Sequence, residues 1–87
     1  MAYALEVARK LDEKLKKMRK REKKKLGIID KKVREILENP LHYKPLRGDL
    51  HGARRVHIDK AFVLIYEVDE SKKVVRLLDY GHHDEIY

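Results

Sequence analysis

Two groups of side chains in this 87-residue chain have the types and spacing that acid-base chemistry requires. Arg55 and His57 stand two positions apart in a short alternating stretch, and the chain ends in the run 81–87, which holds the adjacent pair His82 and His83. Histidine exchanges a proton near neutral pH, and arginine can bind two phosphate oxygens at once. These types could cleave RNA without a metal: a base for the ribose 2′-hydroxyl, cations for the charged phosphorane, and an acid for the leaving oxygen.

The run His82-His83-Asp84-Glu85 also has the composition of a metal site, because imidazole and carboxylate bind divalent ions well. Adjacent residues seldom converge on one ion, however, and no recognised zinc spacing accompanies them. The chain has no cysteine, which excludes a thiol nucleophile and a cysteine metal site. It also lacks a P-loop, a dinucleotide-binding glycine pattern and a nucleophile elbow. We therefore expect neither a metal nor a cofactor.

A concentrated block of positive charge lies in the first half of the chain. The net charge is +7, and nine of the twelve residues from Lys14 to Lys25 are basic. Such a block favours a polyanion as partner, although a solvated helix face that keeps the protein soluble is the competing interpretation. The cations that we expect to bind such a polyanion are Lys16, Lys17, Arg19, Lys20, Arg21, Lys23, Lys24, Arg47 and Arg54.

Periodicity predicts a strand and two helices ahead of these groups. Alternating apolar residues over Tyr3–Val7 predict a strand, and the spacing of apolar residues from about Ala8 predicts an amphipathic helix. A second helix must end near Asn39, because a residue before proline is pushed out of the helical region. The break between the helices is expected within Arg19–Lys23, which lacks an apolar residue, so that Gly27 falls inside the second helix.

Three strands are predicted to follow, at Arg54–Ile58, Phe62–Val68 and Val74–Tyr80, with the middle one central. The expected fold is α+β, a single domain over residues 1–87: an N-terminal strand, a helical hairpin and a three-strand antiparallel meander in one sheet, covered on one face by the helices. Side chains alternate along a strand, so Arg55 and His57 should occupy the open face. The apolar end of the chain is expected to dock rather than remain free.

The composition indicates the kind of organism and the cellular location to expect. Charged residues make up 43% of the chain, against about 25% in an ordinary soluble domain. The abundance of lysine and glutamate, with no glutamine or threonine, is typical of hyperthermophile proteins. No apolar run is long enough to span a membrane and no secretion signal is visible, so a cytoplasmic location is expected.

Four segments, taken in order, resemble the RelE/ParE toxin superfamily, and in particular its mRNA-interferase branches RelE, YoeB and YafQ. They are Asn39-Pro40, the stretch 45–52 that enters the sheet, the strand 63–69, and the ending 81–87, which is most similar to that of YafQ. The resemblance covers nearly the whole chain. It implies a type II toxin that cleaves messenger RNA in the ribosomal A site and is restrained by an acidic, RelB-like antitoxin.

The resemblance also implies roles for individual residues. His83 matches a catalytic histidine, which we expect to act as general acid, and Tyr87 a terminal aromatic position. Arg55 matches a basic position that would contact phosphate. His57 matches a strand position held by His, Arg or Lys in relatives, and Lys44 stands where other branches have a glutamate or histidine that takes part in proton transfer. Either could be the base. His82 is expected to point away from His83 and to matter less.

Besides Lys44, Phe62 departs from the common pattern, because many members have an arginine there. The YafQ-like branch also has an aromatic residue there. Two other functions stay open at this point. One is a non-catalytic, ParE-like inhibitor that binds DNA gyrase, against which the histidine-rich ending argues. The other is a basic RNA-binding protein without catalysis.

Overall fold

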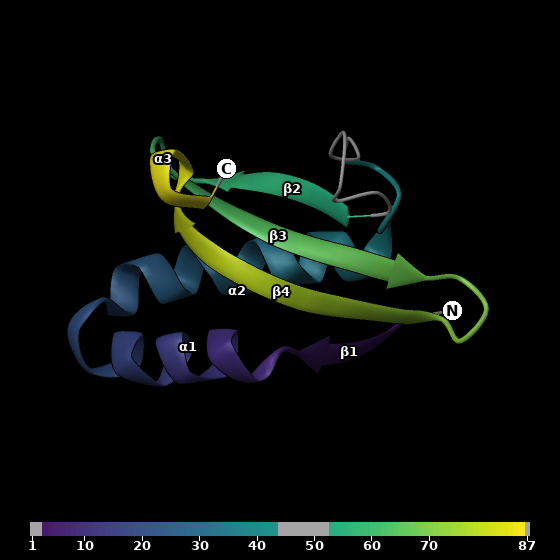
Figure 1. Ribbon diagram of the computed structural model, residues 1–87, viewed down its shortest axis with the longest axis horizontal. Helices are drawn as coiled ribbons and strands as arrows, with labels where there is room; N and C mark the ends of the chain where they lie inside the picture. Colours follow the sequence, from purple (N-terminus) through teal and green to yellow (C-terminus); the bar gives the residue numbers. More distant parts are fainter. Residues whose placement is uncertain (1–2, 44–52, 87) are drawn as a thin grey trace.

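The computed structural model describes residues 3–43 and 53–86, and side chains at the chain end as far as Glu85. Within these ranges the chain forms a four-stranded sheet with two long helices on one face and a short helix at its end (Figure 1). No helix in the described ranges is both long and apolar enough to cross a membrane.

The two long helices are α1 (Arg9–Arg21) and α2 (Lys23–Glu38), and they are separated by the single residue Glu22. Its backbone leaves the helical region, with φ of −134° and ψ of 53°. This confirms the predicted break, which lies where no apolar side chain is available to hold a continuous helix against the sheet. Gly27 lies inside α2, as predicted, and faces open space. The helix ends at Glu38, one residue before Asn39.

The sheet contains β1 (Ala4–Val7), β2 (Ala53–Ile58), β3 (Phe62–Asp69) and β4 (Val74–His82) in the order β1-β4-β3-β2. The last three strands form the predicted antiparallel meander, and β1 adds to β4 in parallel. The sheet is therefore mixed, with both β3 and β4 in its interior.

The main core lies between the helices and the sheet, so the periodicity predicted the buried faces correctly. Leu11 and Ile36 from the helices, and Ile58, Leu64 and Tyr66 from the strands, are fully buried there. The opposite face is less open than expected. A second, smaller apolar cluster on it contains Ala53, Val63 and Ile65, with Leu78 packed against them.

The end of the chain differs from the predicted outline. The last strand continues past Tyr80 to His82, and a short helix, α3 (His83–Ile86), follows it and contacts β3 and β4 (Figure 1). The His83 N–H donates a hydrogen bond of 2.9 Å to the Ala61 carbonyl, which fixes the start of α3 at the beginning of β3. A four-residue helix has no periodicity of its own to predict it. The segment docks, as expected, but as strand followed by helix rather than as a tail.

Tyr66 ties the sheet to the end of α2. Its side chain is fully buried, its hydroxyl donates a 2.7 Å hydrogen bond to the Pro40 carbonyl, and burial raises the pKa of the phenol to about 12. We expect Tyr66→Phe to lower the free energy of unfolding by about 1–2 kcal/mol, because a buried carbonyl loses its donor. Tyr43→Phe, which removes a 3.3 Å bond to Glu35 from a half-buried ring, should cost less. Equal losses in urea unfolding would contradict this assignment.

Candidate functional site

The C-terminal histidines form a compact cluster at the junction of β4 and α3. The His82 and His83 rings stack with centroids 4.7 Å apart and planes at 28°. Asp84 approaches both rings: its Oδ1 lies 2.9 Å from Nδ1 of His83, and its Oδ2 lies 3.6 Å from Nδ1 of His82. The edge of the His82 ring contacts Phe62, with centroids 5.6 Å apart. Both histidine side chains remain partly exposed, so the cluster is held in place yet open to a ligand.

The expectation that His82 points away from His83 is wrong. The backbone changes from strand to helix between the two residues, so their side chains do not alternate as they would along one strand. Among the residues the structure describes, His82, His83 and Asp84 are the one group of three potential metal ligands that converge, with ligand atoms all within 4.8 Å of one another.

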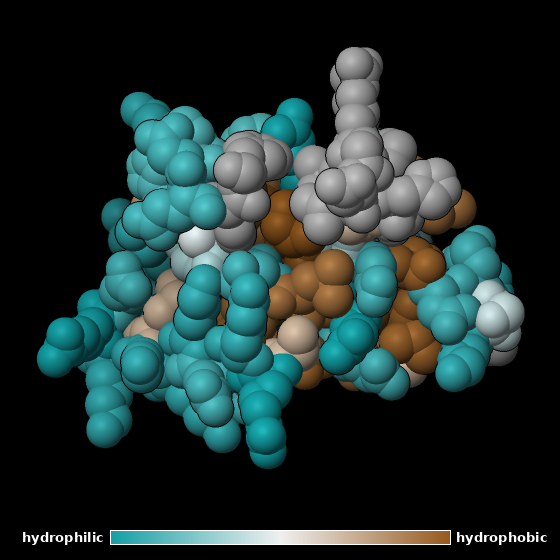
Figure 2. Space-filling view, viewed as in Figure 1, coloured by the Kyte–Doolittle hydropathy of each residue, from teal (hydrophilic) through white to brown (hydrophobic). Residues whose placement is uncertain are grey.

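A cavity of about 500 Å³ lies beside this cluster, between α1 and the end of the chain. Cations from α1 form one side of it and the C-terminal segment forms the other. Its lining residues are Lys14, Lys17, Met18, Arg21, Glu22, Phe62, Tyr80, Gly81, His82 and Glu85. Hydrophilic side chains gather over α1 and over α3, whereas hydrophobic ones lie along the middle of the sheet (Figure 2). The fold thus brings a histidine of the chain end and the cations of the helical hairpin to one hollow.

Aromatic rings line one side of the cavity. Phe62 stacks on Tyr80 with centroids 5.4 Å apart and planes at 13°, and the Lys25 ammonium lies 3.8 Å from the centroid of the Phe62 ring. Burial raises the pKa of the Tyr80 phenol to about 12, with smaller contributions from nearby carboxylates. The Tyr80 ring therefore stays neutral and supports Phe62, which in turn supports His82.

Arg55 and His57 are both exposed on β2, as the alternation predicts. His57 pairs with Val63 on β3, and Val63 pairs with Gly81 on β4, two residues before His83. His57 and Gly81 therefore occupy one row across three strands, about 10 Å apart at two strand spacings. The fold brings His57 and the start of α3 to the same end of the sheet, with Arg55 two residues further along β2.

Three predicted residues, Lys44, Arg47 and Tyr87, lie outside the described residues. Arg54 is half-buried, and its guanidinium donates a hydrogen bond to the Tyr43 carbonyl. This side chain therefore contributes to the fold. Its assignment to RNA binding stays a prediction.

The other seven predicted RNA-binding cations are all exposed on α1 and α2: Lys16, Lys17, Arg19, Lys20, Arg21, Lys23 and Lys24. Within the described ranges, Lys16 alone of these pairs with a carboxylate, that of Asp12 at 3.4 Å. Helix α2 begins with three consecutive lysines and has no acidic residue in its first turn. Positive charge at a helix N-terminus opposes the helix dipole and destabilises the helix. Lys23 and Lys24 therefore do not serve the stability of α2, which favours a role in binding, whereas Lys25 pairs with Glu22 at 3.5 Å.

Asp79 is a residue of this region that no sequence pattern singled out. Its carboxylate lies 2.8 Å from Lys14 Nζ and 3.2 Å from Lys10 Nζ. These two ion pairs hold α1 against β4 beside the cavity. The pairing joins residues 65 positions apart, so no local pattern predicts it.

The pKa of Asp79 is the net result of opposing effects. Burial raises it, but hydrogen bonds from Lys14, the Tyr80 N–H and Lys10 outweigh burial and hold the pKa below its ordinary value. The ionised carboxylate therefore contributes to the free energy of unfolding above about pH 4, and this contribution is lost as the pH falls through the lowered pKa of Asp79. We expect Asp79→Asn to be less stable than the parent at pH 6 in urea unfolding, with the difference shrinking below about pH 4. A difference that does not depend on pH would show that the carboxylate charge is not what matters.

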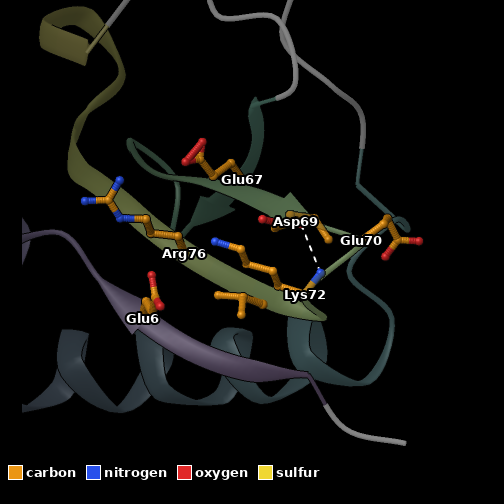
Figure 3. Close-up of a pocket in the computed structure, with 8 residues that line it drawn as sticks. Glu6, Glu67, Asp69, Glu70, Lys72 and Arg76 are labelled. Atoms are coloured by element: carbon orange, nitrogen blue, oxygen red, sulfur yellow. Dashed lines mark hydrogen bonds between the residues drawn. The ribbon is translucent and has the colours of Figure 1, made fainter.

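A second cavity of about 480 Å³ lies at the other end of the sheet, around the β3–β4 turn. Four carboxylates line it, and Arg76 extends between Glu6 and Glu67, its partners on the neighbouring strands (Figure 3). Asp69 accepts hydrogen bonds from the Ser71 hydroxyl and the Lys72 N–H, which lower its pKa. These charges are explained by the turn and by cross-strand pairs, and the cavity holds no histidine. The candidate site is therefore the histidine end of the sheet.

Comparisons with known proteins agree on one family of toxins. The family model of the ParE-like toxins of type II bacterial toxin-antitoxin systems matches residues 5–87. A Methanocaldococcus jannaschii protein provisionally named toxin RelE4 is 53% identical over 85 residues, which cover 98% of this chain and 90% of that protein.

Solved structures show the same fold. A YoeB/ParE toxin from Agrobacterium tumefaciens superposes with a TM-score of 0.85 at 17% identity, over 92% of this chain and 98% of that one. A chain of the intact E. coli RelBE toxin-antitoxin complex superposes with a TM-score of 0.75 at 24% identity, over 93% of this chain and 96% of that one.

Proposed function

This chain belongs to the ParE-like toxins of type II toxin-antitoxin systems, within the RelE/ParE superfamily, and from that membership we propose that it is an endoribonuclease that cleaves messenger RNA on the ribosome. The observation that carries the proposal is the hollow in which His82 faces Lys14, Lys17 and Arg21. Cations there would hold phosphates of an RNA strand, and the His83 imidazole, whose ring stacks on that of His82, would move a proton.

The proposed reaction needs no metal. A base removes the proton of a ribose 2′-hydroxyl, and the 2′-oxygen attacks the adjacent phosphorus. The bond from phosphorus to the 5′-oxygen breaks, and His83 gives that oxygen a proton from Nε2. The products are a 2′,3′-cyclic phosphate and a 5′-hydroxyl end. Asp84, 2.9 Å from Nδ1 of His83, would orient the ring.

Two residues remain candidates for the base. His57 is exposed on β2 and lies in register with Gly81 through Val63 of β3. This position near the start of α3 supports His57 as the base. Lys44 would need a lowered pKa, which crowding by other cations can provide. Arg55, on the same strand as His57, would bind the scissile phosphate, and Tyr87 would complete the site from the chain end.

Arg55 provides a test of phosphate binding. Lysine keeps the charge but cannot bind two phosphate oxygens in the same planar arrangement, so Arg55→Lys should slow cleavage nearly as much as Arg55→Ala. We expect losses of about tenfold or more for both, measured as single-turnover cleavage of ribosome-bound mRNA. If Arg55→Lys cleaves at the parent rate, Arg55 contributes no more than charge.

The proposed partners are the ribosome with its mRNA and an acidic, RelB-like antitoxin. A chain of the RelBE toxin-antitoxin complex is among the structures with this fold, which supports an antitoxin of that kind. An acidic amphipathic helix could cover the cavity and neutralise its cations at once, and so exclude RNA.

Expression of the chain with and without an acidic protein encoded beside its gene tests the proposal. Growth should stop and mRNA should be cut when the chain is expressed alone, and both effects should disappear when the neighbour is present. Growth arrest with intact mRNA and altered DNA supercoiling would instead support the gyrase-binding alternative that the ParE-like name raises. RNA binding with neither effect would leave a non-catalytic RNA-binding protein.

A further inference from the structure

We propose that His82, His83 and Asp84 bind a divalent transition metal ion of the zinc class, and that the bound ion inhibits the toxin. The binding site stands on geometry alone. The inhibition rests on the proposed function, because it requires that His83 be the general acid.

The three side chains already approach the arrangement of a metal site. One ligand atom from each residue lies within 4.8 Å of the others, and Asp84 Oδ1 is 2.9 Å from Nδ1 of His83. Ligands about 2.0–2.2 Å from a tetrahedral zinc ion are about 3.4 Å apart from one another. The widest of these separations must therefore shorten by up to about 1.4 Å, which rotation of partly exposed side chains can supply.

The surroundings hold part of the site in place before an ion arrives. The His82 ring is held against Phe62, which stacks on Tyr80, and the His83 N–H is bonded to the Ala61 carbonyl. The His82 ring and the His83 backbone would therefore lose little conformational freedom on binding, while the exposed Asp84 side chain can rotate to close the site.

The His82 ring has a nitrogen suited to binding a metal. Its Nδ1 accepts a 3.2 Å hydrogen bond from the Asp84 N–H, so in the neutral ring this nitrogen carries a lone pair rather than a proton. A metal ion at Nδ1 would replace a long hydrogen bond with a coordinate bond. The remaining positions on the ion would be open to water, as the exposure of the cluster allows.

The donor set selects the class of ion. Two imidazoles and one carboxylate suit zinc, nickel or copper, whereas magnesium and calcium prefer oxygen ligands. The charges of the neighbouring cavity do not decide the choice, because Glu22 and Glu85 line it together with Lys17 and Arg21, and Lys14 is paired with Asp79. Magnesium should therefore not bind.

A metal ion at this cluster would stop the proposed reaction directly. A ring nitrogen that holds a metal cannot hold a proton, so a metal-bound His83 cannot become the doubly protonated ring that a general acid requires. The ion would also take over the Asp84 carboxylate, which otherwise orients that ring.

Binding is tested with the untagged chain by titration calorimetry against zinc chloride, with nickel and magnesium chloride in parallel. We expect one zinc ion per chain, similar behaviour with nickel, and no detectable binding of magnesium. His82→Ala and Asp84→Asn should each weaken zinc binding by about tenfold or more. His42→Ala removes an exposed histidine that contacts Tyr43 and should leave zinc binding unchanged. Circular dichroism checks that each variant is folded.

Zinc affinity equal in the parent, His82→Ala and Asp84→Asn would overturn the site. The second measurement is cleavage of ribosome-bound mRNA, with each variant's rate in zinc divided by its own rate without metal. Zinc should inhibit the parent and His42→Ala strongly, and His82→Ala and Asp84→Asn far less.

The two proposals fail in different ways. Zinc binding at the cluster without any change in cleavage would overturn the inhibition. A requirement for zinc in cleavage would overturn both the inhibition and the metal-free reaction. A chain that binds zinc and cleaves nothing in any condition would disprove the proposed function and with it the inhibition, while confirming the site.

Discussion

Replacing His83 with alanine is expected to slow cleavage of ribosome-bound mRNA by about 10²- to 10⁴-fold, the range over which a general acid contributes to a reaction. Without the imidazole, the 5′-oxygen must leave as an alkoxide or take its proton from water. Ribosome binding should persist, because the cations of the helical hairpin remain. The measurement is single-turnover cleavage at saturating enzyme, alongside a separate binding assay.

The matched control is His42→Ala, which removes an exposed histidine next to Tyr43 on a different part of the chain. It should cleave at the parent rate. His82→Ala should lose less than His83→Ala, since His82 is not the residue that Asp84 approaches at 2.9 Å. Cleavage by His83→Ala at the parent rate would remove His83 from the reaction.

Reversing the charge at Lys16, Lys20 and Lys24 is expected to weaken ribosome binding by about tenfold or more and to flatten its salt dependence. Each lost phosphate contact lowers the slope of log affinity against log salt by about 0.7–0.9, so the loss of three contacts should lower it by about 2 to 3. The fold should survive, and glutamate at position 24 even suits the first turn of α2, where lysine opposes the helix dipole.

A second triple variant controls for net charge. Reversal at Lys31, Arg34 and Lys72 changes the charge equally at exposed positions outside the basic stretch. It also breaks an i,i+4 pair, Arg34 with Asp30 at 3.0 Å, just as reversal at Lys16 breaks its pair with Asp12. If both triple variants bind the ribosome with the same affinity and salt slope, the hairpin is a solvated scaffold and docking occurs on the sheet side.

Most of the fold could be predicted from the sequence, because strong local sequence patterns agreed with the tertiary structure. Burial at period 3.6 defined the two helices, and the charge-rich stretch between Met18 and Leu26 left nothing apolar to bury, which placed the break near Glu22. Local sequence patterns did not predict the features that tertiary contacts determine. A register shift between Ile65 and Tyr66 and the short helix α3 have no periodicity to predict them.

The candidate site was predictable by residue type but not by arrangement. Alternation correctly exposed Arg55 and His57, since that rule holds within one strand. The same rule failed at His82 and His83, because a change from strand to helix falls between them and stacks their rings. The pairing of Lys14 with Asp79, and the cavity that α1 forms with the chain end, join distant segments. Only the fold could reveal them.

The central claim, metal-free cleavage of mRNA on the ribosome, is tested most directly by the ends of the products. Purified chain, purified ribosomes and a defined mRNA are combined, and the new ends are identified by their susceptibility to kinase and ligase. Attack by the 2′-hydroxyl leaves a 5′-hydroxyl and a 2′,3′-cyclic phosphate, or a 3′-phosphate after ring opening, and cleavage should require the ribosome. New 5′-phosphate ends, which metal-activated water usually produces, would contradict the account.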